Sequence, residues 1–402
     1  MTAPDAPAGS TDKAGSTDKA ESGHPTSSDI PAGGEGAAPS GEGMIGWDLA
    51  QRVATRVARR TPTIASYELA ALASDFEELT AVAEDLVTAE TGLQSLVGPA
   101  RARVVDRSEW VDANIASFQR LLRPVTDKLA VALESRKRSP LLPGSVSRSV
   151  SGTQVGLLLG WMSTRVLGQY DQLLIEDEHP EDQDIVYYVG PNVLALEKRF
   201  DFPPREFRLW LALHEVTHRA QFTGVPWMRR HFLSLVEHTL DGLDPDPKRL
   251  LDALRRAAQG IRTGHNPLDD GGLITLLASP EQLKAIQEIG GLMSLLEGHG
   301  DVTMDRAGAD RIPNAARFGQ ALRERRQQRG LAKVVSVLIG LDAKLRQYEQ
   351  GERFIEAVED AGGAEMLARV WTGPQWLPTS AEIREPDHWI ARAAVPATLA
   401  QP

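Results

Sequence analysis

Two histidines and a glutamate fall within five consecutive residues, His214-Glu215-Val216-Thr217-His218. On a helix, residues four apart lie on the same face one turn apart, so both imidazoles could reach one tetrahedral metal ion. Glu215 lies beside them, where its carboxylate could take a proton from water at the metal. The spacing therefore predicts a zinc (Zn2+) site that activates water. The chain has 9 histidines among 402 residues, and a chance occurrence of the pattern on an ordinary helix is the alternative.

The flanking residues favour a helix around this pattern. Pro203 and Pro204 suit the first turn of a helix, where a missing N–H costs nothing, and Gly224 followed by Pro226 gives a stop. Apolar residues between these limits recur on most sides of such a helix. We therefore expect the helix to be buried, in an interior where a metal ion interacts strongly with nearby charges.

A catalytic zinc ion usually has three protein ligands and one position left for water. The metzincin pattern would place Gly at 221 and His at 224, but the chain has Gln221 and Gly224, so that pattern is excluded. The best candidate for the third ligand is Glu297. If its segment is helical, Asp301 shares its face and could accept the second N–H of a ligating histidine. This Glu-x-x-x-Asp pair is typical of a gluzincin.

Other interpretations of this region stay open. His299 is the rival ligand, but residues two apart on a helix point to nearly opposite sides, so His299 and Glu297 are not expected to bind one ion. Glu297 and Asp301 could also be ordinary solvated carboxylates. His238 and His299 are candidate donors to the oxyanion that forms when water attacks a carbonyl group. A purely structural role is the alternative for His238.

Several motifs together carry a resemblance to a known family. They are the residues from His214 to His218 and three further segments: Gly160-Trp161-Met162-Ser163, Arg165-Val166-Leu167-Gly168-Gln169-Tyr170-Asp171 and Leu296-Glu297-Gly298-His299-Gly300-Asp301. From about residue 45 to 390 the chain resembles the second zincin-like family of actinobacterial metallopeptidases. Members are often assigned to biosynthesis of the deazaflavin coenzyme. The resemblance implies that this assignment comes from gene neighbourhood rather than demonstrated chemistry.

The resemblance implies a fold and a set of roles. The fold would be mainly α (α+β), a helical zincin of gluzincin type. Zinc would be held by His214, His218 and Glu297, and Glu215 would act as the base. The resemblance does not supply a substrate.

Composition excludes some classes of partner and site. The formal net charge of −11 disfavours nonspecific binding to nucleic acid or to anionic membranes. The absence of cysteine excludes disulfides and thiolate ligands, and it suits a reducing cytoplasm. The first residues do not resemble a signal peptide, and no apolar run is long enough to span a bilayer. We expect a soluble, cytoplasmic protein with neither nucleic-acid nor membrane partners; no feature predicts an oligomeric state.

The pattern along the chain predicts two lobes between two tails. Their expected limits are a disordered tail at 1–43, a helical lobe at 44–145, a zincin-like catalytic domain at 146–390 and a C-terminal tail at 391–402. The residues from 151 to 167 are expected to form a buried helix. Another helix is expected to open at Pro280, with Ser279 as its N-cap, and to carry Glu297.

A small β-sheet is expected beside the metal helix. Residues 169–175 and 184–189 have strand-like content, and residues 192–196 could add a third strand. The edge of such a sheet could hold an extended peptide by main-chain pairing. The alternative is a sheet that only covers the core.

Two functional hypotheses follow. The first is a zinc-dependent hydrolase, most simply a gluzincin-type metallopeptidase acting on a peptide or protein substrate, with Glu215 activating the water. The alternative is a catalytically inactive, zinc-stabilised scaffold or pseudo-peptidase that binds a partner. A structural zinc site has no need of a glutamate between its ligands, which favours the enzyme.

Overall fold

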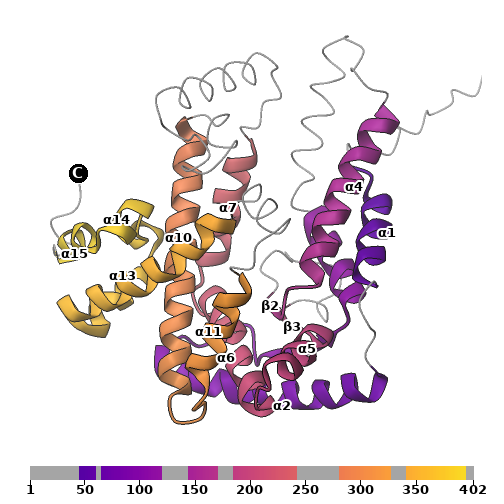
Figure 1. Cartoon of the computed structure of the whole chain (residues 1–402). Coiled ribbons are helices and arrows are strands. Elements are labelled where there is room, and N and C mark those ends of the chain that lie inside the picture. The colour runs from indigo at the N-terminus through magenta and orange to yellow at the C-terminus, as the bar shows by residue number, and fades with distance from the viewer. Residues whose placement is uncertain are drawn as a thin grey trace, which may run out of the picture. The chain divides into compact units, whose positions relative to one another are not determined.

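The protein is mainly helical, with one small β-sheet, which confirms the predicted mainly α (α+β) class (Figure 1). The computed structural model describes residues 45–59, 65–119, 144–170, 184–241, 280–326 and 341–394. The predicted tail at 1–43 and residues 395–402 lie outside the described residues. The limits of the two predicted lobes stay a prediction.

The larger elements follow one another along the chain. They are α1 (Trp47–Ala58), α2 (Ser66–Thr91), β1 (Arg101–Val105), α4 (Gly144–Ser163), β2 (Gly168–Tyr170), β3 (Ile185–Val189), α5 (Gly190–Phe200), α6 (Pro204–Thr223), α7 (Met228–Asp241), α10 (Pro280–Gly308), α11 (Ala315–Arg326), α13 (Leu341–Ala368), α14 (Ser380–Arg384) and α15 (Pro386–Ala394).

Helix α6, which carries the two histidines of the motif, is buried along most of its length. It begins at Pro204, and the N–H of Gly224 closes its last turn on the carbonyl of Ala220, so the predicted limits are confirmed. Its apolar residues, including Leu213 and Val216, join a core with residues of α2, β3, α10 and α11. Because neighbours surround it, α6 also buries most of its polar side chains.

The sheet has three strands in the order β1-β3-β2. β3 pairs in parallel with β1 and antiparallel with β2, with Gly168 opposite Tyr188. Successive side chains of a strand point to opposite faces. Accordingly, Val186 and Tyr188 join the core around α6, while Ile185 and Tyr187 join a second core with α1 and α4. β3 is thus buried on both faces.

The prediction for residues 192–196 is wrong, because they lie in helix α5 rather than in a strand. Pro191 occupies the first turn, where a helix tolerates proline, and Lys198 and Arg199 lie at the end of the helix that favours positive charge. The strand predicted at 184–189 is confirmed as β3. Of the strand predicted at 169–175, Gln169 and Tyr170 lie in β2, and the rest falls outside the described residues.

The third strand is β1, in a stretch whose pattern predicts helix, and that prediction is also wrong. Its five residues alternate between arginine at 101 and 103 and smaller apolar residues at 102 and 104. Alternation of this kind suits a strand with one face on the core, but five residues are too few to outweigh the helical pattern on either side.

Helix α4 confirms the helix predicted at 151–167, although it ends at Ser163 and is only partly buried. Gly152, Gly156 and Gly160 lie against α1, and a Cβ at Gly156 would come 2.5 Å from the carbonyl oxygen of Ala50. Leu157, on another side of α4, is 52% exposed. Among the described helices, none has the length and apolar character needed to cross a membrane.

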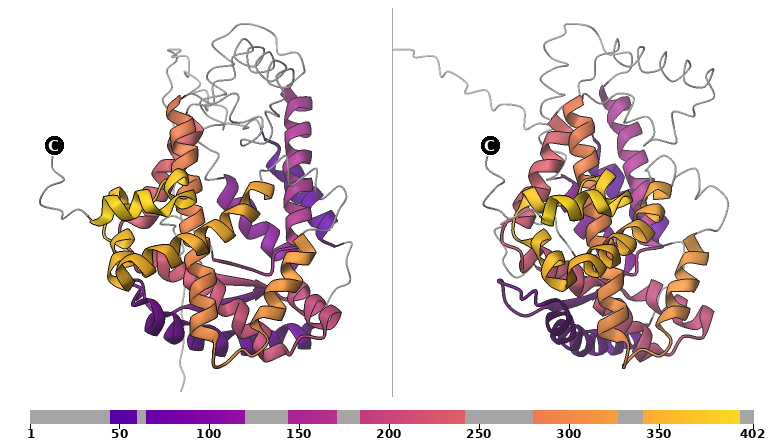
Figure 2. Two further views of the ribbon diagram at one scale, coloured as in Figure 1. Left: turned by 60° about the vertical axis from the view of Figure 1, so that its left-hand side comes forward. Right: turned by 90° about the vertical axis from the view of Figure 1, so that its left-hand side faces the viewer.

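Helix α10 lies between the core around α6 and a third core formed with α13 and α15. Figure 2 shows α13 crossing α10 in both views. At the crossing Gly298 faces Gly351, and a Cβ at position 298 would overlap the backbone of Gly351. The helix continues without a break through its glycines, which bring α13 close on the side of α10 that carries Gly298.

We expect Gly298→Ala to destabilise the protein by about 1–3 kcal/mol, because the added methyl group overpacks the crossing. Gly300→Ala is the matched control on the same helix, since its Cβ would meet Cε1 of His218 at an ordinary 3.5 Å. Alanine at 300 should leave the melting temperature unchanged or raise it, because alanine favours helix over glycine. Equal melting temperatures for the two variants would contradict this account of the crossing.

Candidate metal centre

Three side chains from two helices converge at one point. His214 and His218 of α6 and Glu297 of α10 each offer one ligand atom, and these atoms lie within 4.8 Å of one another. Nε2 of His218 is 3.6 Å from Oε2 of Glu297. A tetrahedral zinc ion with bonds of about 2.0–2.1 Å separates its ligand atoms by roughly 3.4 Å. Two imidazoles and a carboxylate in this arrangement fit a divalent metal such as zinc.

The cluster is mostly shielded from solvent. His218 is 8% exposed and Glu297 is 4% exposed, while His214 is only partly buried. The two imidazole rings lie edge to face, with centroids 4.6 Å apart. Solvent therefore reaches the cluster most readily beside His214.

Strand β2 holds the carboxylate of Glu215. The main-chain N–H of Tyr170 donates to Oε2 of Glu215 at 3.1 Å. A Cβ at Gly168 would lie 2.6 Å from Oε1 of the same carboxylate, so only glycine leaves room for it. Glu215 is 6% exposed. Neither Gly168 nor the N–H of Tyr170 could be assigned this role from the sequence, because the contact depends on how β2 packs against α6.

Gln221 accepts the hydrogen bond from Nδ1 of His218, the ring nitrogen that does not face Glu297. Nδ1 of His218 is 3.0 Å from Oε1 of Gln221, the residue three positions further along α6. Asp301 lies in α10 and is half-buried, and its predicted support of a ligating histidine stays a prediction. The available sequence signal for Gln221 is its helical spacing from His218.

His299 is not one of the three residues whose ligand atoms converge. Its Nδ1 is 3.0 Å from Nε2 of Gln221, and its ring packs edge to face against Trp371 with centroids 4.9 Å apart. Burial lowers the pKa of His299 to about 4, and the positive charge of His218 adds to this effect. The imidazole of His299 is therefore neutral near pH 7. Its predicted role as an oxyanion donor stays a prediction.

The structure does not bring His238 into the cluster. It lies on the exposed part of α7, where its Nδ1 donates to the carbonyl of Ser234 at 2.6 Å. Such a bond to its own helix agrees with the purely structural role that is the alternative for His238, and its predicted role as an oxyanion donor stays a prediction.

A buried arginine fixes α6 against the sheet. Arg219 is 1% exposed, and its guanidinium donates to both carboxylate oxygens of Asp184 at 3.0 and 2.7 Å. It also donates to Glu84 of α2 at 2.6 Å and to the carbonyl of Gly98 at 2.7 Å. Asp184 immediately precedes β3. These bonds therefore set the position of the sheet, and with it that of Tyr170, relative to the metal helix.

Comparison with known proteins identifies the family. The model of the zincin-like metallopeptidases matches residues 45–390. The chain belongs to this family. Family membership and the His-His-Glu cluster together support a metal-dependent hydrolase. The actinobacterial branch and the deazaflavin association implied by the sequence motifs stay predictions.

One protein of known structure has a similar fold. The crystal structure of a suspected hydrolase with a novel fold, from Chloroflexus aurantiacus, is 30% identical to this chain with a TM-score of 0.63. The match covers 87% of this chain and 98% of the other. No curated protein matches the chain.

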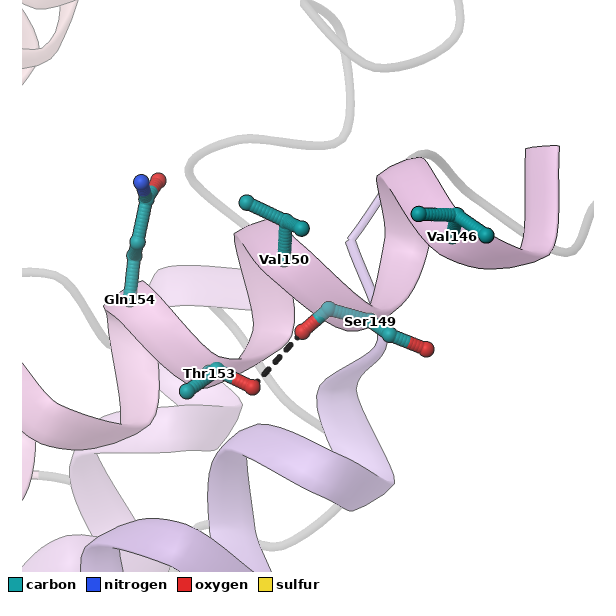
Figure 3. Close-up of a pocket in the computed structure, with 5 residues that line it drawn as sticks. All are labelled: Val146, Ser149, Val150, Thr153 and Gln154. Atoms are coloured by element: carbon teal, nitrogen blue, oxygen red, sulfur yellow. Dashed lines mark hydrogen bonds between the residues drawn. The ribbon is translucent and has the colours of Figure 1, made fainter. Parts of the chain in front are cut away.

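A cavity elsewhere on this zincin-like protein is separate from the metal cluster. It has a volume of about 450 Å³ and is lined by α4 residues, namely Val146, Ser149, Val150, Thr153 and Gln154 (Figure 3). None of these side chains is ionisable near neutral pH or a strong metal ligand. The cavity therefore gives no indication of a second metal site.

The apparent affinity for zinc should rise with pH. Burial, the largest single influence, would lower the pKa of His218, but the carboxylates of Glu297 and Glu215 outweigh it and raise the pKa to about 9 in the metal-free protein. Below this pKa, zinc must displace a proton from His218, so affinity should rise by up to about tenfold per pH unit and level off above about pH 9.

Competition with a chromophoric chelator between pH 6 and 10, corrected for the chelator's own titration, measures this dependence. An affinity that is already constant from pH 7 upward would contradict it. The same pKa shift makes the free energy of unfolding of the metal-free protein depend on pH. Because the folded pKa of His218 exceeds its unfolded value of about 6.5, protonated His218 contributes fully to stability below about pH 6.5. This contribution is lost as pH rises through about 9.

Proposed function

We propose that this protein is a zinc-dependent hydrolase, most simply a peptidase of gluzincin type. The observation that carries the proposal is the convergence of His214, His218 and Glu297, with Glu215 between the two histidines in the sequence and held in place by β2. Membership of the zincin-like metallopeptidase family supports it. The substrate class we propose is a peptide or protein.

Each residue of the proposed site would have its own role in hydrolysis. When bound, zinc acts as a Lewis acid and makes water more acidic. The imidazoles of His214 and His218 and the carboxylate of Glu297 would hold the ion. Glu215 would take a proton from the attacking water and then deliver it to the nitrogen of the leaving amine. The N–H of Tyr170 orients the Glu215 carboxylate for this transfer.

Strand β2 is also the proposed wall for an extended peptide. It lies at one edge of the sheet, beside α6, which is where an added strand could pair with it. In the free protein, the N–H of Tyr170 is engaged by Glu215. We therefore place the pairing of a substrate at the other outward-facing groups of β2, around Gly168.

Zinc content tests the proposed site directly. We expect about one zinc ion per chain, measured by mass spectrometry of protein purified without added metal. Glu297→Ala should lose most of this zinc because it removes one of the three ligands. Glu288→Ala is the matched control, since Glu288 is a carboxylate on the same helix that lies outside the cluster and pairs with Lys284, 3.8 Å away. Wild-type protein without zinc, even after reconstitution, would contradict the proposal.

Glu215→Gln tests the chemistry. The amide keeps the size of the side chain but cannot take a proton, so the variant should retain zinc and lose turnover by about 100- to 10,000-fold. Cleavage of a proteome-derived peptide library, read by mass spectrometry, measures the turnover of zinc-matched samples. A fully active variant would rule out this mechanism. A zinc-loaded wild type that cleaves nothing and does not bind a small chelating hydroxamate would indicate the inactive scaffold instead.

A further inference from the structure

Gln221 joins the two helices of the metal cluster through three contacts. Its side chain is completely buried, at 0% exposure. Its Oε1 lies 3.0 Å from Nδ1 of His218, and its Nε2 lies 3.0 Å from the carbonyl oxygen of Leu296 and 3.0 Å from Nδ1 of His299. Leu296 directly precedes Glu297. The amide therefore reaches from the helix of two proposed ligands to the turn that carries the third.

Only one orientation of this amide satisfies its contacts. A backbone carbonyl accepts hydrogen bonds and cannot donate them, so the NH₂ group of Gln221 must face Leu296. The second N–H of that group then meets Nδ1 of His299, which must accept it. The oxygen of the amide is left facing His218, so Nδ1 of His218 must carry a hydrogen and donate to it.

This orientation decides which nitrogen of His218 is available to a metal ion. With the hydrogen on Nδ1, the lone pair of a neutral imidazole is on Nε2. That atom is the one 3.6 Å from Oε2 of Glu297. The direction of the carbonyl of Leu296 thus determines, through one amide, where the lone pair of His218 points.

We propose that Gln221 is a positioning residue of the metal centre, which fixes the tautomer of His218 and holds α6 in register with the turn of Glu297. The inference rests on the proposed metal site and adds to it a residue that the His-Glu-x-x-His pattern does not contain. Position 221 is the one at which the metzincin pattern requires glycine, which has no side chain to make such a bridge.

Gln221→Met tests the bridge, because methionine keeps the length of the side chain and removes all three hydrogen bonds. Zinc affinity, measured by chelator competition, should fall by about 10- to 100-fold. The visible spectrum of the cobalt-substituted protein should also change, since the ring of His218 is no longer held. Gln221→Glu should recover part of the affinity, because its carboxylate can still accept from Nδ1–H of His218 but cannot donate to the carbonyl of Leu296.

Thr223→Val is the matched control. It removes a buried hydrogen bond on the same helix, from Thr223 to the carbonyl of Arg219 at 2.8 Å, without touching the cluster. Its zinc affinity and cobalt spectrum should match those of the wild type. Circular dichroism of each metal-free variant separates loss of the fold from loss of the site.

Nitrogen NMR of the wild-type protein decides the question even if Gln221→Met does not fold. In zinc-loaded protein labelled with ¹⁵N-histidine, His218, assigned by its loss in His218→Ala, should bind metal through Nε2 and carry its hydrogen on Nδ1. Coordination through Nδ1 would overturn the inference, as would a folded Gln221→Met with wild-type affinity and spectrum. Wild-type protein that binds no metal would overturn the proposed function and this inference together.

Discussion

The buried positive charge of Arg219 is the constraint on which the site depends. Removing a guanidinium ion from water costs several kcal/mol unless charged partners and hydrogen bonds replace the lost hydration. Here the partners come from α2, from the residue before β3 and from the loop before β1. Because Tyr170 pairs with Val186 in the same sheet, fixing β3 also fixes the N–H that holds Glu215. The charge compensation of one side chain thus places the proposed base beside the proposed ligands.

The sequence identifies those residues of α6 whose relative positions are fixed by the geometry of that one helix. The spacing of His214 and His218 fixes a shared face through helix geometry alone, and the prolines and glycine mark the limits of the helix. Glu297 could also be selected, because its helix has a clear start at Pro280. That it meets His218 is a property of how α6 and α10 pack, which helical periodicity does not encode.

What the sequence could not predict depends on contacts between distant segments. Gln221 reads as one more residue on the face of the metal helix until Leu296 and His299 are brought to it. Gly168 has no side chain to suggest a role, and it matters because Glu215 occupies the space that a side chain would fill. Two errors in secondary structure have a simpler reason. The pattern predicts helix where the structure has β1, and a strand at 192–196, which lies within α5. Stretches of about five residues give periodicity too few positions to separate helix from strand.

All three proposed ligands lie on α6 and α10, which pack against each other, and α10 also packs against α13. Their backbone positions are therefore set by the cores and by the Gly298 crossing rather than by the metal. Small zinc modules differ, because there the binding energy of the ion is spent on folding the chain. In this protein an ion would bind to ligand residues that the fold has already positioned. A chelator should therefore remove the ion reversibly and leave the helices folded. The chain would then be folded with or without the ion, and occupancy of the site would follow the supply of metal around the protein.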